Sequence, residues 1–196
     1  MSLVIDAATQ DLLFREARTA NTFTDEPVTD EQVQAIYDLV KYAPTAMNSQ
    51  PLRIVLVRSD EARERLVNQM GDGNKAKTGS APLVAIVAVD TDFHEHLPTQ
   101  FPHYPGAKDA FAEEDARIPT GSFNASLQIG YLIIGIRAAG LAAGPMAGYD
   151  AEGINKEFFG DGKHRVLAVI NIGRPGEGAW FPRNPRLEYD QVVTTV

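Results

Sequence analysis

The chain has 196 residues, of which 44% are hydrophobic and 22% charged, and this composition suits one globular domain with a buried core. Because it contains no cysteine, thiol nucleophiles, cysteine-bound zinc and iron–sulfur clusters are excluded, and a cytoplasmic location is expected. The net charge of −8 argues against a general nucleic-acid binder.

The first third of the chain predicts helices around one strand. Residues 7–18 are expected to form a helix. The segment Thr29–Gln32 has the pattern of a capping box, and the helix behind it is expected to end at Pro44, which lacks a backbone N–H. Residues 53–57 predict a strand, and Ser59 is expected to cap the next helix.

The middle of the chain predicts a buried strand followed by a long excursion. Residues 83–89 are apolar without interruption, which is typical of a strand covered on both faces. Residues 91–119 are rich in proline, histidine and aromatic residues, with a short helix expected near 107–116. Excursions of this length often cover a pocket, and we expect that role here.

Residues 121–139 predict an apolar central helix that ends at Gly140. Gln128 and Arg137 interrupt its apolar stretch, so we expect a buried helix and no membrane span. The amino-terminal residues also lack the pattern of a signal peptide. Because a helix that is apolar on nearly all sides must be covered all round, a second copy of the chain is the expected cover.

The last third predicts one more buried strand, at 166–172, and then a tail. Residues 174–196 are too rich in proline and glycine to form a core, so we expect them to wrap another surface, with a strand-like end at 191–196. The order of elements predicts a single α+β domain over residues 1–196, a three-layer sandwich with helices on both faces of one sheet.

Several common motifs are absent or misplaced. Residues 71–76 match G-x-G-x-x-A, but they follow a predicted helix and not the strand that a dinucleotide fingerprint needs. His94 and His96, with Asp92, leave a metal-dependent hydrolase as one alternative, although an ordinary loop is the stronger interpretation. We therefore expect no metal.

Three polar groups are harder to explain by packing. Residues 43–51 concentrate hydroxyl and amide groups between a helix and a strand. Asn74 and Lys77 pair an amide with a cation at i and i+3. Arginines near both ends of the chain could converge into an anion site, and their planar donors suit phosphate.

These groups together resemble the FMN-dependent nitroreductase family. Residues 44–51 resemble its P-[ST]-x-x-N-x-Q-P signature, and Asn74 with Lys77 resembles its N-x-x-K. Three further matches occur in the family's order, at residues 18–27, 144–150 and 184–193. The chain departs from the family by having Arg18 alone where many relatives have two or three arginines, and Ala147 where some have glutamate.

The resemblance implies a nitroreductase-like sandwich that forms a domain-swapped homodimer, with residues 174–196 wrapping the partner and FMN held by both subunits. No catalytic side chain is identified, since no residue stands out as a general acid. The residues that the resemblance places around FMN are Arg18, Thr19, Asn21, Thr45, Ala46, Asn48, Asn74, Lys77, Ala147, Gly148, Arg183 and Arg186. Of these, Thr45, Ala46 and Asn48 would reach FMN from the partner subunit.

Within that family, the sequence is most similar to the malonic semialdehyde reductases of pyrimidine breakdown. This similarity rests on residues 16–21, 97–103, 144–146 and 181–183. It implies that NADH or NADPH reduces FMN and that a small aldehyde then takes the hydride, giving 3-hydroxypropionate. The alternatives are a broad nitroreductase or quinone reductase and, in another class, a flavin-binding protein without turnover.

Overall fold

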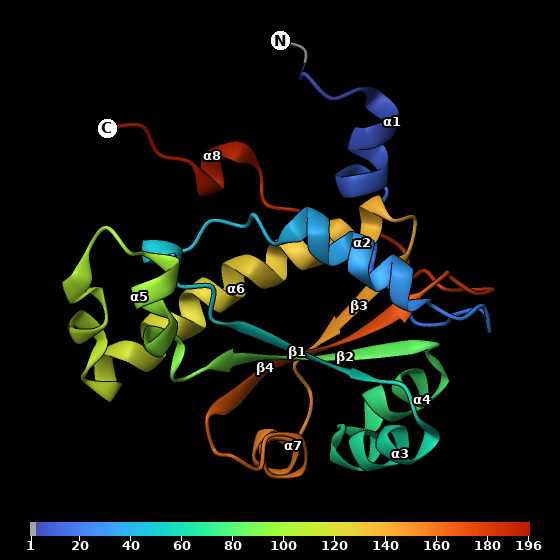
Figure 1. Cartoon of the computed structure of the whole chain (residues 1–196). Coiled ribbons are helices and arrows are strands. Elements are labelled where there is room, and N and C mark those ends of the chain that lie inside the picture. Colours follow the sequence, from blue (N-terminus) through green and yellow to red (C-terminus); the bar gives the residue numbers. More distant parts are fainter. Residues whose placement is uncertain (1–2) are drawn as a thin grey trace.

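A computed structural model describes residues 3–196 and centres on a four-stranded antiparallel sheet (Figure 1). The strand order is β1-β2-β4-β3. The strands are β1 (Leu52–Val57), β2 (Leu83–Asp90), β3 (Ala142–Met146) and β4 (His164–Gly173). Strand β2 is buried at every position, as its unbroken apolar sequence predicts.

Helices cover both faces of the sheet (Figure 1). On one face lie α2 (Asp30–Val40) and α6 (Glu114–Ala138). On the other lie α3 (Asp60–Gln69), α4 (Asp72–Ser80) and α7 (Ala151–Phe158). One hydrophobic cluster fills each interlayer space. The predicted three-layer α/β/α sandwich is therefore confirmed.

The remaining elements are short and lie outside these layers. They are α1 (Ala7–Gln10), the π-turn η1 (Asp11–Arg15), α5 (Leu97–Gln100), α8 (Tyr189–Val192), and the 3-10 turns η2 (Ala46–Asn48), η3 (Phe93–His96), η4 (Pro105–Ala107) and η5 (Asp109–Phe111).

The predicted helix ends follow the capping rules. Thr29 and Gln32 form the complete capping box of α2, and Ser59 caps α3 by accepting the amide of Ala62. At the end of α6, Gly140 has a φ of 73°, and its amide bonds the carbonyl of Arg137. That left-handed residue satisfies carbonyls that the helix end would otherwise leave free.

Two boundaries predicted in the first half are wrong. The helix expected over 7–18 ends at Arg15, because residues 16–21 run alongside the carboxyl-terminal tail instead. Helix α2 ends at Val40, before Pro44, where the chain makes a tight turn in which Ala43 bonds the carbonyl of Val40.

The prediction for the excursion is also wrong in part. No helix spans 107–116; short 3-10 turns occupy that region, and α6 begins at Glu114 and continues through Pro119. Arg117 stabilises this early start, since its guanidinium donates to the carbonyls of Thr91, Phe111 and Ala112. None of these contacts between distant residues is visible in a local pattern.

Strand β3 was missed, and the end of the tail was misread. Residues 142–146 contain glycine and proline, which is unusual for a strand, yet β3 lies at an edge of the sheet where Pro145 is tolerated. Residues 191–196 were expected to resemble a strand, but α8 occupies their beginning. Among residues 3–196, no helix is both long enough and apolar enough to cross a membrane.

The contact between α6 and α2 gives the first prediction. A Cβ at residue 135 would lie 2.3 Å from Cγ1 of Val40, a stiff β-branched side chain in the core. We expect Gly135→Ala to lower the free energy of unfolding by about 1–2 kcal/mol, since overpacking outweighs the better helix propensity of alanine.

Chemical denaturation measures the effect, with Gly73→Ala as the control. Gly73 also lies in a helix but has no neighbouring atom within 4 Å of an added Cβ. Its substitution should leave stability unchanged or slightly higher. Equal effects of the two substitutions would contradict the proposed overpacking at residue 135.

Candidate functional site

Helix α4 and the turn after β3 form one continuous surface. Asn74 Nδ2 donates to the carbonyl of Gly148 at 2.9 Å, and the amide of Gly71 donates to the same oxygen at 2.9 Å. Lys77 lies one turn further along α4, and Ala147 and Gly148 are exposed. The structure therefore brings four of the candidate residues together.

Glycine is required at position 148 by the close approach of Asn74. A Cβ there would lie 2.7 Å from Asn74 Nδ2, too close for an ordinary contact. The missing side chain leaves the backbone beside Ala147 open, so that a flat ligand can approach it.

A buried polar group underlies this surface, and sequence reasoning missed it. The sulfur of Met146 lies 3.9 Å from both Thr78 Oγ1 and Asn171 Nδ2. Asn171 Oδ1 is buried and accepts no hydrogen bond from residues 3–196. A polar residue inside the apolar run of β4 was the available signal, because buried polar groups normally serve a specific partner.

The segment from Arg18 to Asn21 lies beside β3 and the tail. The amide of Asn21 donates to the carbonyl of Ala179 at 3.0 Å, and Arg18 Nη1 lies 3.4 Å from the carbonyl of Phe181. The intervening Ala20 packs closely on Gly144 of β3, while Thr19 is exposed. The beginning and end of the chain therefore meet at this edge of the sheet.

The two tail arginines behave differently. Arg183 donates to the carbonyls of Arg15 and Ala17, so its guanidinium lies against the amino-terminal segment. Arg186 bonds only the carbonyls of its neighbours Asn184 and Pro185 and is exposed. Arg183 thus lies against the segment that contains Arg18, whereas the hydrogen bonds of Arg186 within residues 3–196 go only to its own neighbours in the tail.

The loop that contains Thr45, Ala46 and Asn48 has a strained backbone. Met47, Asn48 and Gln50 have φ values of 52°, 50° and 43°, in the left-handed region that side chains rarely adopt. Such conformations cost on the order of 1–3 kcal/mol each and persist only where the surroundings impose them.

Two polar residues of α6 impose this conformation, and neither was identified from the sequence. Asn124 Oδ1 accepts the amide of Ala46 at 2.7 Å, and Gln128 Oε1 accepts the amide of Leu52 at 3.0 Å. Both lie on the buried side of α6, one turn apart. Their spacing at i and i+4 in an apolar helix was the signal that could have revealed them.

The loop and the surface at Gly148 lie at opposite edges of the sheet. The loop leads into β1, one edge strand, whereas Gly148 follows β3, the other edge strand, and β2 and β4 lie between them. Three inter-strand spacings of roughly 4.8 Å separate the two edges by about 14 Å. Thr45, Ala46 and Asn48 therefore do not join the other candidates within one chain.

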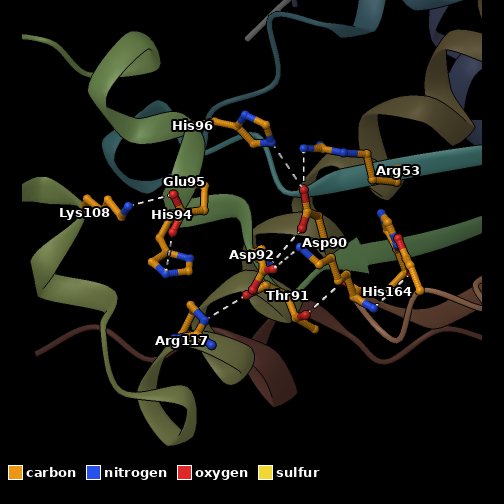
Figure 2. Close-up of polar contacts among 12 residues, drawn as sticks. Arg53, Asp90, Thr91, Asp92, His94, Glu95, His96, Lys108, Arg117 and His164 are labelled. Carbon is orange, nitrogen blue, oxygen red and sulfur yellow. Dashed lines mark hydrogen bonds and ion pairs between the residues drawn. The ribbon is translucent and has the colours of Figure 1, made fainter.

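A polar network around Asp90 occupies the loop end of the sheet (Figure 2). Arg53 Nη2 lies 2.6 Å from the carboxylate of Asp90, and His96 Nε2 lies 3.5 Å from it. The same carboxylate accepts the amide of Asp92 at 2.8 Å. Asp90 is buried, so these contacts compensate for the loss of water around its charge.

The metal-site alternative has no support in this geometry. Asp92 pairs with Lys163 at 3.1 Å, His94 lies 3.7 Å from Glu95, and His96 contacts Asp90. The three residues therefore have separate partners. Across residues 3–196 no three histidine or acidic side chains converge as metal ligands would.

Comparisons with known proteins agree on one family. The model of the nitroreductase family matches residues 14–174. A Streptomyces coelicolor protein provisionally named NADH dehydrogenase/NAD(P)H nitroreductase is 69% identical over 197 residues, which cover 100% of both chains.

Solved structures agree with this match at the level of the fold. A provisionally named nitroreductase from Bacillus subtilis has a TM-score of 0.87 at 24% identity and covers 97% of this chain and 100% of its own. A second, from Exiguobacterium sibiricum in complex with FMN, has a TM-score of 0.82 at 18% identity and covers 100% of this chain and 99% of its own.

The anchoring of the strained loop gives the second prediction. Asn124→Ala removes the acceptor for the Ala46 amide, so we expect stability to fall by about 1–3 kcal/mol and amides 46–50 to exchange faster with solvent. Thermal denaturation and hydrogen exchange measure the two effects. Ser126→Ala on the exposed side of the same helix is the control, and unchanged exchange in Asn124→Ala would refute the anchor.

Proposed function

Because the chain belongs to the nitroreductase family, we propose that it is an FMN-dependent NAD(P)H oxidoreductase. The observation that carries this proposal is the bond from Asn74 to Gly148, which places an amide, a cation and open backbone on one surface. Neutral donors, a cation and a backbone without side chains suit the polar edge and flat face of an isoalloxazine ring.

The residues present fit FMN at its charged end as well. Arg18 lies in the amino-terminal segment and Arg183 of the tail lies against that segment, where cationic donors suit a phosphate group. Thr19 and Asn21 follow Arg18 in the chain and offer neutral groups for a ribityl chain. Arg186 remains a candidate through the tail of a second subunit.

When bound, FMN would supply the chemistry, which is hydride transfer from NAD(P)H to an oxidised substrate. The residues of the protein would bind the cofactor and orient it. Lys77 forms no ion pair within residues 3–196, so its positive charge remains available to the surface at Gly148. Asn74 holds the turn that presents the amides of Ala147 and Gly148.

We infer that the active form is a homodimer. Phe123, Leu127 and Tyr131 form a stripe along α6 and are 65%, 40% and 45% exposed. Contiguous apolar surface of this kind marks an interface, and a symmetric pair is the commonest solution. A partner would also bring Thr45, Ala46 and Asn48 to the site, which one chain cannot do. The exposed tail, including α8, would wrap that partner (Figure 1).

For the substrate, we propose a small aldehyde such as malonic semialdehyde, reduced to 3-hydroxypropionate in the cytoplasm. This specificity is supported by the sequence similarity at residues 16–21, 97–103, 144–146 and 181–183. The names of the relatives fit a broad NAD(P)H nitroreductase or quinone reductase equally well. The choice between these specificities requires kinetics.

Anaerobic half-reactions test the function. The purified protein should be yellow and should bleach when NADH or NADPH is added. Malonic semialdehyde should then reoxidise the reduced protein faster than nitroaromatics, quinones or free flavin do. A faster reaction with nitroaromatics would establish the broad reductase instead. Yellow protein that does not bleach would indicate a flavin-binding protein without turnover, and protein unable to bind FMN would refute the proposal.

The stripe on α6 gives a test of the dimer. Phe123→Glu places a charge in the proposed interface, so we expect light scattering to show monomers and FMN affinity to fall at least tenfold. Asn68→Glu adds the same charge to the exposed surface of α3 and should remain dimeric. A wild-type protein that is monomeric with full FMN affinity would exclude a shared site.

A further inference from the structure

A small cavity opens where the amino-terminal segment, the end of α6 and the tail meet. Its volume is about 190 Å³, and both Arg18 and Arg137 line it, together with Trp180. Arg183 lies close by, against the carbonyls of Arg15 and Ala17. Guanidinium groups from three separate parts of the sequence therefore gather around one cavity.

These charges are poorly compensated. Two carboxylates also line the cavity, but Asp11 pairs with Arg15 and Glu16 lies 3.6 Å from Arg18. Within residues 3–196, neither Arg137 nor Arg183 forms an ion pair with a carboxylate. Burial lowers the pKa of Arg137, and the nearby charge of Arg183 lowers that pKa further. In a chain with a net charge of −8, such a gathering of like charges needs a reason.

A purely structural role explains Arg137 incompletely. Its position in the last turn of α6 suits a cation, and its Nη1 donates to the carbonyl of Leu13 at 2.9 Å. Two other half-buried arginines make more bonds to carbonyls: Arg63 donates to four and Arg117 to three. Arg137 has one such bond, so most of its five N–H groups have no acceptor within residues 3–196.

We propose that Arg137 is a phosphate-binding residue and that this cavity takes a phosphate monoester. The dianion would offset the excess charge, and the planar donors of arginine match its oxygens. The cavity is smaller than the roughly 300–1,000 Å³ of sites for whole drug-sized ligands, so it suits the phosphate end of a longer molecule. The inference rests on the proposed function, under which the source is FMN or the 2′-phosphate of NADPH.

Comparison of FMN with riboflavin isolates the phosphate. Flavin-free protein is titrated with each by fluorescence quenching, for the wild type, Arg137→Gln, Arg137→Lys and Arg117→Gln. We expect Arg137→Gln to weaken FMN binding about tenfold or more without changing riboflavin binding, and Arg137→Lys to restore part of the loss. Arg117→Gln, at the opposite end of α6, should leave the ratio of FMN to riboflavin affinity unchanged.

Each other outcome is also decisive. If the flavin ratio is unchanged but Arg137→Gln raises the KM for NADPH and not for NADH, the phosphate monoester is that of NADPH. Equal weakening of FMN and riboflavin, with unchanged preference between the two nicotinamide cofactors, would show that Arg137 is structural and overturn the inference.

A separate measurement tests the anion site even if the proposed function is wrong. If the wild type binds neither flavin, that function fails, and inorganic phosphate then tests the cavity directly. Thermal stabilisation by phosphate in the wild type but not in Arg137→Gln would still support the anion site. The same stabilisation in both proteins, or in neither, would overturn it.

Discussion

The hydrogen bond from Asn74 to the carbonyl of Gly148 connects the two parts of the candidate site. It fixes α4 against the turn after β3, and it depends on the absence of a Cβ at residue 148. The amide of Gly71 bonds the same carbonyl, so the N-cap and the first turn of α4 are both held against the turn after β3. Because this contact lies at the surface of a rigid sandwich, the donors that face the proposed flavin keep one arrangement.

The chain collects positive charge at one place although it is acidic overall. Arg18, Arg137 and Arg183 come from the amino-terminal segment, the end of α6 and the tail. Main-chain carbonyls hold Arg137 and Arg183, and no carboxylate within residues 3–196 neutralises them. These like charges repel each other, and the proposed phosphate group would offset that repulsion.

The other half of the candidate site stores backbone strain. Three left-handed residues lie between Thr45 and Pro51, and Asn124 and Gln128 hold this segment from the buried side of α6. The loop lies at the β1 edge of the sheet and Gly148 follows the β3 edge, so the two do not meet within one chain. The exposed stripe of α6 provides the surface by which a second copy could use the loop.

The sequence by itself determined what depends on neighbouring residues: the buried strands β2 and β4, the capping of α2 and α3, the left-handed Gly140 and the three-layer class. Its ordered motifs also identified the family before any geometry was known. Only the tertiary structure decided the early start of α6, the edge strand β3, the place of Arg183 and the position of Arg137 at the cavity. The reason is physical: caps and periodicity act over a few residues, whereas these features depend on side chains and carbonyls that folding brings together from distant parts of the chain.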